Sequence, residues 1–210
     1  MRNRKTEIAR YTIEIDMPKA NGRCVLHSWE AFMFACILEG VADVKRYGRS
    51  KVSIPYEVAG KSSTYTPELF VEQNAAHLLI DVGCESSDKN SPQSERQSAI
   101  DEWCVAHNYQ YQRIPGNRVW AQSCLAFNWA RISRWLMQSL DESPSPIRPQ
   151  ICSLVASRGT LSVGQVVRHF DARPEHHTVT AICHLLHTGG LTAELSERPF
   201  SSTTALSLSS

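Results

Sequence analysis

The stretch from Tyr65 to Gly83, YTPELFVEQNAAHLLIDVG, contains the elements that decide the fold of this chain. Leu69 to Val71 is a short apolar run that predicts a strand, and Leu78 to Val82 is a compact run typical of a buried central strand. If the two strands are antiparallel neighbours, Glu68 and Asp81 come together at one end of a sheet. A carboxylate in that position is costly unless it is paired, hydrogen-bonded or bound to a metal.

Helical and strand patterns continue on both sides of this stretch. The sequence predicts a helix over Val25 to Leu38, ended by Gly40, and an edge strand over Val52 to Val58. Downstream it predicts helices over residues 95–107 and 125–140, with a strand over residues 109–114 between them. We therefore expect an α/β domain over residues 1–142, in which helices flank a mixed sheet.

A second, smaller domain is expected over residues 143–210. The segment Ser143 to Pro149, SPSPIRP, has the proline content of an exposed connection. Helices are predicted after it over residues 147–157, 160–167 and 176–187, followed by two strands, 191–195 and 203–208, that pair across a turn. This order is typical of a winged helix, a variant of the helix-turn-helix.

The composition limits the class of protein. The 210 residues carry a net charge of +1, which is not the profile of a protein that coats nucleic acid. The seven cysteines are odd in number and form no CxxC pair, so we expect free thiols in a reducing compartment. No signal peptide and no membrane-spanning run is apparent. We expect a soluble, cytoplasmic protein without a membrane partner.

A third acidic residue, Glu30, lies on the first predicted helix. Two or three converging carboxylates would suit Mg²⁺, which prefers oxygen ligands and can activate water against a phosphodiester. The alternative is that Glu30, Glu68 and Asp81 are ordinary solvated or capping carboxylates, since the chain has 21 acidic residues.

Four segments then follow one another in an order found in a known family: Ser28-Trp29-Glu30, Val52-Ser53-Ile54-Pro55, Tyr65-Thr66-Pro67-Glu68-Leu69-Phe70 and Leu79-Ile80-Asp81-Val82-Gly83. In this order the chain resembles TnsA, the endonuclease subunit of heteromeric Tn-seven-like transposases. The resemblance implies a restriction-endonuclease-like N-terminal domain of the PD-(D/E)xK type and a winged-helix C-terminal domain, and so covers most of the chain.

The resemblance also implies an activity and its partners. Glu30, Glu68 and Asp81 would be the catalytic residues and the ligands of Mg²⁺ or Mn²⁺. The reaction would be cleavage of the 5′ ends of a transposon. DNA, a TnsB-like transposase and a TnsC-like ATPase would be the partners.

The sequence departs from the family at two of these positions. Glu68 stands where the family has aspartate, and Gly83 stands where it has a catalytic lysine. Two alternatives follow: Lys61 or Lys89 supplies the missing cation, or the chain is a catalytically degenerate scaffold, without a metal, that binds DNA and partners but does not cut. A third alternative is a winged-helix regulator with an unrelated N-terminal sensor domain.

Two further groups are candidates for DNA contact. The first is a basic set between the first helix and the predicted edge strand, which either touches the phosphate backbone or is a solvated hairpin: Lys45, Arg46, Arg49 and Lys51. The second is His176 and His177, which we expect, with His184 and His187, to be exposed at a DNA or partner surface rather than to bind zinc.

Overall fold

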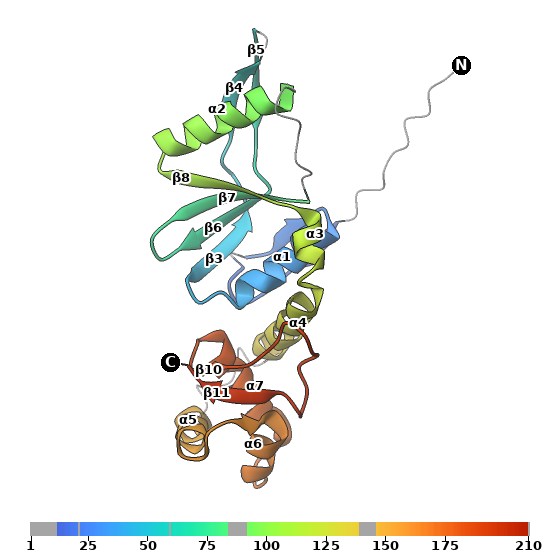
Figure 1. The fold of residues 1–210 in the computed structure, drawn as a ribbon, viewed down its shortest axis with the longest axis vertical. Coiled ribbons are helices and arrows are strands. Elements are labelled where there is room, and N and C mark those ends of the chain that lie inside the picture. Colours follow the sequence, from blue (N-terminus) through green and yellow to red (C-terminus); the bar gives the residue numbers. More distant parts are fainter. Residues whose placement is uncertain (1–11, 21, 59, 84–91, 139–145, 210) are drawn as a thin grey trace, which may run out of the picture.

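The computed structural model describes residues 12–20, 22–58, 60–83, 92–138 and 146–209 (Figure 1). The molecule is elongated, with a sheet at one end, a small helical part at the other, and helix α4 (Ser123–Gln138) between them. Within the described ranges, no helix has the length and apolar character that crossing a bilayer requires.

The N-terminal part is built on a four-stranded mixed sheet. Its strand order is β3-β6-β7-β8, with β3–β6 and β6–β7 antiparallel and β7–β8 parallel. The strands are β3 (Val44–Arg49), β6 (Leu69–Gln73), β7 (His77–Val82) and β8 (Tyr109–Ile114). The α/β class and the mixed sheet flanked by helices are confirmed.

The two faces of the sheet carry different helices. Helix α1 (Trp29–Glu39) packs on the face that buries Leu78 and Ile80, while α2 (Pro92–Ala106) covers the opposite face. On that second face Leu79 packs with Ile100 and Cys104 of α2. Because side chains alternate along a strand, neighbouring residues of β7 enter two separate cores.

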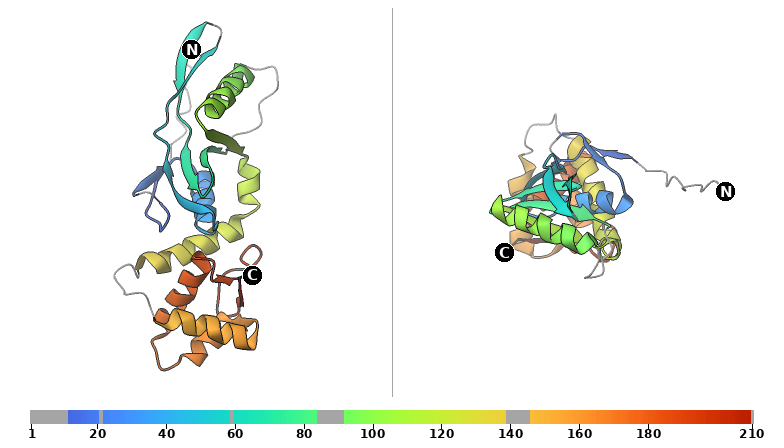
Figure 2. Two further views of the ribbon diagram at one scale, coloured as in Figure 1. Left: turned by 90° about the vertical axis from the view of Figure 1, so that its left-hand side faces the viewer. Right: turned by 90° about the horizontal axis from the view of Figure 1, so that it is seen from above.

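A hairpin of β4 (Ile54–Val58) and β5 (Lys61–Tyr65) projects beyond the sheet, with α2 beside it (Figure 2, left). A second antiparallel pair, β1 (Ile13–Ile15) and β2 (Cys24–Leu26), precedes α1. The prediction of a helix from Val25 was therefore wrong at its start. Ser28 begins α1 instead, because its hydroxyl caps the helix by accepting the Ala31 N–H at 3.0 Å.

The C-terminal part consists of three helices and a small antiparallel sheet. Its elements in chain order are α5 (Ile147–Arg158), β9 (Leu161–Ser162), α6 (Val163–His169), α7 (Glu175–His187), β10 (Leu191–Thr192) and β11 (Ala205–Leu208). The strand order is β10-β11-β9, so the predicted pair has a third member. The boundary predicted at residue 143 falls outside the described residues.

Strand β9 was missed because the sequence predicts one helix over residues 160–167. Ser162 divides that segment: its hydroxyl accepts the Gln165 N–H, and the Gln165 side chain accepts the Ser162 N–H in return. This reciprocal capping box makes Ser162 the N-cap, so α6 begins at Val163. Leu161 and Ser162 remain extended and pair with β11.

Helix α4 joins the two parts by close packing. A Cβ at Gly40, directly after α1, would come within 2.1 Å of the Trp129 ring of α4, so only glycine permits this approach. On the C-terminal side, the buried Asn128 amide donates to the carbonyls of Leu195 and Arg198 and accepts the Phe200 N–H. The loop between β10 and β11 is thereby held on α4.

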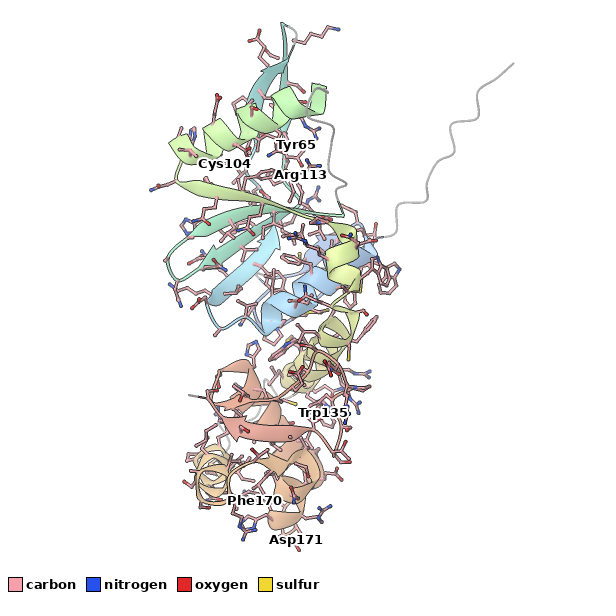
Figure 3. The ribbon with its side chains drawn as sticks, viewed as in Figure 1. Tyr65, Cys104, Arg113, Trp135, Phe170 and Asp171 are labelled. Atoms are coloured by element: carbon pink, nitrogen blue, oxygen red, sulfur yellow. The ribbon has the colours of Figure 1, made fainter. Side chains whose placement is uncertain are left out.

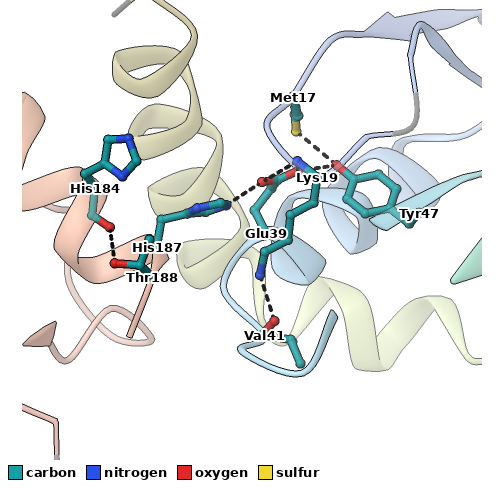
Figure 4. Close-up of polar contacts among 8 residues, drawn as sticks. All are labelled: Met17, Lys19, Glu39, Val41, Tyr47, His184, His187 and Thr188. Atoms are coloured by element: carbon teal, nitrogen blue, oxygen red, sulfur yellow. Dashed lines mark hydrogen bonds and ion pairs between the residues drawn. The ribbon is translucent and has the colours of Figure 1, made fainter. Parts of the chain in front are cut away.

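A buried carboxylate forms a second connection between the parts (Figure 4). Glu39, the last residue of α1, has no exposed surface and accepts hydrogen bonds from the Lys19 N–H at 3.1 Å and the Tyr47 hydroxyl at 2.8 Å. His187, the last residue of α7, places Nε2 at 3.0 Å from its other oxygen. The expectation that His187 is exposed was wrong, because this carboxylate buries it.

Candidate carboxylate site

Glu68 and Asp81 are adjacent across two neighbouring strands. The antiparallel register of β6 and β7 pairs Leu69 with Ile80, which places Glu68 opposite Asp81. The Glu68 N–H donates to Asp81 Oδ1 at 2.9 Å. The condition under which the sequence would bring Glu68 and Asp81 together, an antiparallel pairing of their strands, is therefore met.

Glu30 reaches the same end of the sheet from the first turn of α1. Its Oε1 accepts the indole N–H of Trp120 at 2.9 Å. Trp120 belongs to α3 (Gly116–Trp120), which lies so close that a Cβ at Gly116 would be 3.4 Å from Glu30 Cγ. Trp120 is half exposed, so this aromatic residue faces the surface beside the carboxylate.

The surroundings of Glu68 raise the pKa of its carboxyl. Burial raises the pKa of Glu68, and the negative charges of Asp81 and Glu30 raise it further. Backbone N–H groups of Val82 and His27 donate to its carboxylate and act in the opposite direction. The structure thus brings Glu30, Glu68 and Asp81 together.

Asp81 is held by two tyrosines that sequence reasoning missed. The hydroxyls of Tyr65 in β5 and Tyr111 in β8 both donate to its Oδ2. Burial, together with the charge of Asp81, raises the pKa of Tyr111 far above its ordinary value, so this phenol stays protonated as a donor. The alternation Tyr109-Gln-Tyr111 indicates that the two tyrosines lie on the same face of a strand. It does not indicate which acidic residue they contact.

The three carboxylates are of the residue type that Mg²⁺ prefers. Carboxylate oxygens are its preferred ligands, and a bound cation would relieve the repulsion that raises the pKa of Glu68. Asp81 already accepts three hydrogen bonds, and a carboxylate offers about four lone-pair positions. Among the described residues, no three His, Cys, Asp or Glu side chains are arranged to share one ion. The residue types fit the ion, but holding it would require these side chains to move closer together.

Gly83 adopts a conformation that disfavours a lysine. Its φ is +80°, in the left-handed region, and its N–H donates to the Ile114 carbonyl at 3.0 Å. Lys61 opens β5, four residues from Tyr65, which is about 13 Å along an extended strand. The hairpin therefore carries Lys61 away from Asp81, and Lys89 lies outside the described residues.

The predicted DNA-contacting residues do not form one patch. Three of them lie on β3 and the fourth follows it, all exposed: Lys45, Arg46, Arg49 and Lys51. Arg46 pairs with Glu72 of β6, whereas Arg49 pairs in register with Leu69 at the Glu68 end. The set does lie between α1 and β4, as predicted, but three of its members belong to strand β3, which the sequence did not predict.

The predicted histidines lie in the C-terminal part. His176 and His177 occupy the first turn of α7, with ring centroids 4.2 Å apart, so they do not join the carboxylates. His176 is exposed and His177 is half-buried.

The six cysteines among the described residues are free thiols.

Comparison with known proteins gives no family: no family model matches the chain, and no curated protein is significantly similar to it.

Proposed function

We propose that this chain is a TnsA-like subunit of a DNA transposition complex, which cleaves the 5′ ends of a transposon together with a partner transposase. One observation carries the proposal: Glu30, Glu68 and Asp81, from three separate segments, meet at one end of the sheet. These are the residues that the resemblance implies for catalysis.

The architecture supports the same proposal. The mixed sheet between α1 and α2 is compatible with a restriction-endonuclease-like domain. Three helices followed by strands β10 and β11 have the order of a winged helix. An unrelated sensor domain would have no reason to gather the three carboxylates, so we do not favour the regulator alternative.

The chemistry would be hydrolysis of a phosphodiester. Glu30, Glu68 and Asp81 would hold Mg²⁺ or Mn²⁺, which supplies Lewis-acid polarisation and an activated water. The Tyr65 and Tyr111 hydroxyls fix the position of Asp81, and the Trp120 indole fixes that of Glu30. Exposed Arg49, at the Glu68 end of β3, would contact the DNA backbone.

The test is nicking of transposon-end DNA by the chain with its partner transposase, in Mg²⁺ or Mn²⁺. We expect 5′-end nicks from the parent, their loss in Glu68→Gln, and no change in Glu57→Gln, whose carboxylate is exposed on β4. Nicking that persists in Glu68→Gln would refute the assignment of the site.

A second candidate function is a scaffold that binds DNA and a TnsB-like or TnsC-like partner without cutting. The specific observation is that Gly83 has a φ of +80° while the Tyr65 and Tyr111 hydroxyls both occupy Oδ2 of Asp81. A Gly83→Lys variant would be strained, so it is a poor test. Two results together would establish the scaffold. The parent and Glu68→Gln would form equally stable complexes on transposon ends, and neither would nick the DNA.

A further inference from the structure

The proposed site gathers three negative charges, and neither Gly83 nor Lys61 can offset them. A phosphodiester is itself an anion, so a fixed cation close to Asp81 would favour its entry, with or without a metal ion on the carboxylates. We propose that Arg113 is this cation and binds the phosphodiester that enters the carboxylate site. The inference rests on the proposed function, in its cutting or its scaffold form.

The register of the sheet places Arg113 beside Asp81. Strands β7 and β8 are parallel, and Asp81 pairs directly with Arg113. Tyr111, two residues earlier, donates to Asp81 and packs in the core under α2. Since residues two apart share a face, Arg113 lies on that face, whereas Ile114 packs in the opposite core.

A second arginine comes from the helix that covers this face. The guanidinium carbon of Arg96 in α2 lies 5.0 Å from the centroid of the Tyr65 ring, and Tyr65 in turn donates to Asp81. Arg96 Nε is buried and has no hydrogen-bond partner among the residues that the structure describes. Figure 3 shows Tyr65 and Arg113 together between α2 and the sheet. The positive charge is thus concentrated on the α2 side of Asp81.

A third arginine near this end of the sheet, Arg49, has a different position. It lies two residues after Tyr47, whose side chain packs in the α1 core. Arg49 therefore approaches from the α1 face. Of these three arginines, Arg113 is the one that pairs directly with Asp81 across two strands and lies on the same α2-facing side of the sheet.

The chemistry of arginine suits this role. A guanidinium stays charged at every physiological pH and donates two parallel hydrogen bonds to phosphate oxygens. Arg113 would bind the phosphodiester and stabilise the charge that develops on it, without taking a proton or forming a covalent bond.

The test is binding of a short labelled duplex with a transposon-end sequence, measured over a range of salt concentrations. We expect Arg113→Gln to weaken binding about tenfold, the usual effect of losing a hydrogen bond to a charged group. The slope of log K against log salt should fall by about 1, as for one lost phosphate contact. Arg113→Lys should keep the slope, and exposed Arg158→Gln in α5 should behave as the parent.

A second measurement needs no variant and covers the case in which Arg113→Gln does not fold. Bound duplex should protect Arg113 of the parent from an arginine-specific dicarbonyl reagent, detected by peptide mass spectrometry, while Arg158 stays reactive. An unchanged slope in folded Arg113→Gln, or equal reactivity of Arg113 with and without duplex, would overturn the inference alone. A parent chain that binds no duplex would overturn the proposed function as well.

Discussion

At the scale of single residues, the surroundings of Glu68 disfavour the ionised form of its carboxyl group. Its burial, and then the charges of Asp81 and Glu30, raise the pKa of the Glu68 carboxyl above its ordinary value. The folded chain therefore holds the Glu68 proton more tightly than the unfolded chain does. Protonated Glu68 contributes its full stabilisation of the fold at pH values below the pKa of Glu68 in the unfolded chain. This stabilisation is lost as the pH rises through the pKa of Glu68 in the folded chain.

Glu68→Gln is accordingly expected to stabilise the fold at neutral pH, by about 0.5–2 kcal/mol. The parent should lose stability as pH rises above about 4.5 through the raised pKa of Glu68, and the variant should lose less. Urea denaturation at several pH values measures both effects. A variant less stable than the parent at pH 7 would show that the Glu68 charge is compensated in the folded chain.

Glu39 is the opposite case, a buried carboxylate whose surroundings satisfy it. Removing it in Glu39→Ala leaves the Lys19 N–H, the Tyr47 hydroxyl and His187 without their acceptor. We expect a loss of about 3–5 kcal/mol of unfolding free energy. Denaturant titration measures it, with exposed Glu57→Ala as the control that changes it by less than about 0.5 kcal/mol.

At the scale of elements, α4 organises the loop between β10 and β11. Asn128 uses both its amide nitrogen and its oxygen on that loop, at 2.8 Å to Leu195 O and 2.7 Å from Phe200 N. Arg131, one turn later, donates to the Phe200 carbonyl at 3.0 Å. Helix α4 thereby restricts the freedom of this loop.

Asn128→Ala should release the loop and destabilise the fold by about 1–3 kcal/mol, because buried backbone groups lose their partners. Hydrogen exchange of the Phe200 amide should accelerate, while that of β6 amides stays slow. Gln122→Ala, exposed near the start of α4, is the matched control. Unchanged protection at Phe200 would mean that the loop is ordered by its own packing.

At the scale of the whole molecule, Glu39 and His187 connect two helix ends that are 148 residues apart in the chain. Glu39 is the last residue of α1 and His187 is the last residue of α7. An open pocket of about 440 Å³ lies beside this contact, with Trp129 and Leu195 among its lining residues. Apolar packing on α4, together with a small number of polar contacts, holds the two parts in their relative position.

His187→Ala is expected to lower the melting temperature and to separate the unfolding of the two parts, since about 1–3 kcal/mol of coupling is lost. Differential scanning calorimetry would detect a broadened or double transition. His176→Ala, at the exposed start of α7, should leave the transition single. A single, unshifted transition in His187→Ala would show that apolar packing against α4 is sufficient to join the parts.

The sequence by itself determined the local elements and one half of the site. Periodicity identified α4 and α7, and the two apolar runs beside Glu68 and Asp81 were enough to predict two strands, because a strand pattern is a local property. The sequence left open whether those strands are antiparallel neighbours, and the tertiary structure shows that they are. The tertiary structure decided what each group meets. Tyr111 on Asp81, Trp120 on Glu30 and His187 on Glu39 bring together residues far apart in the chain, and such contacts depend on register and packing that no local pattern encodes.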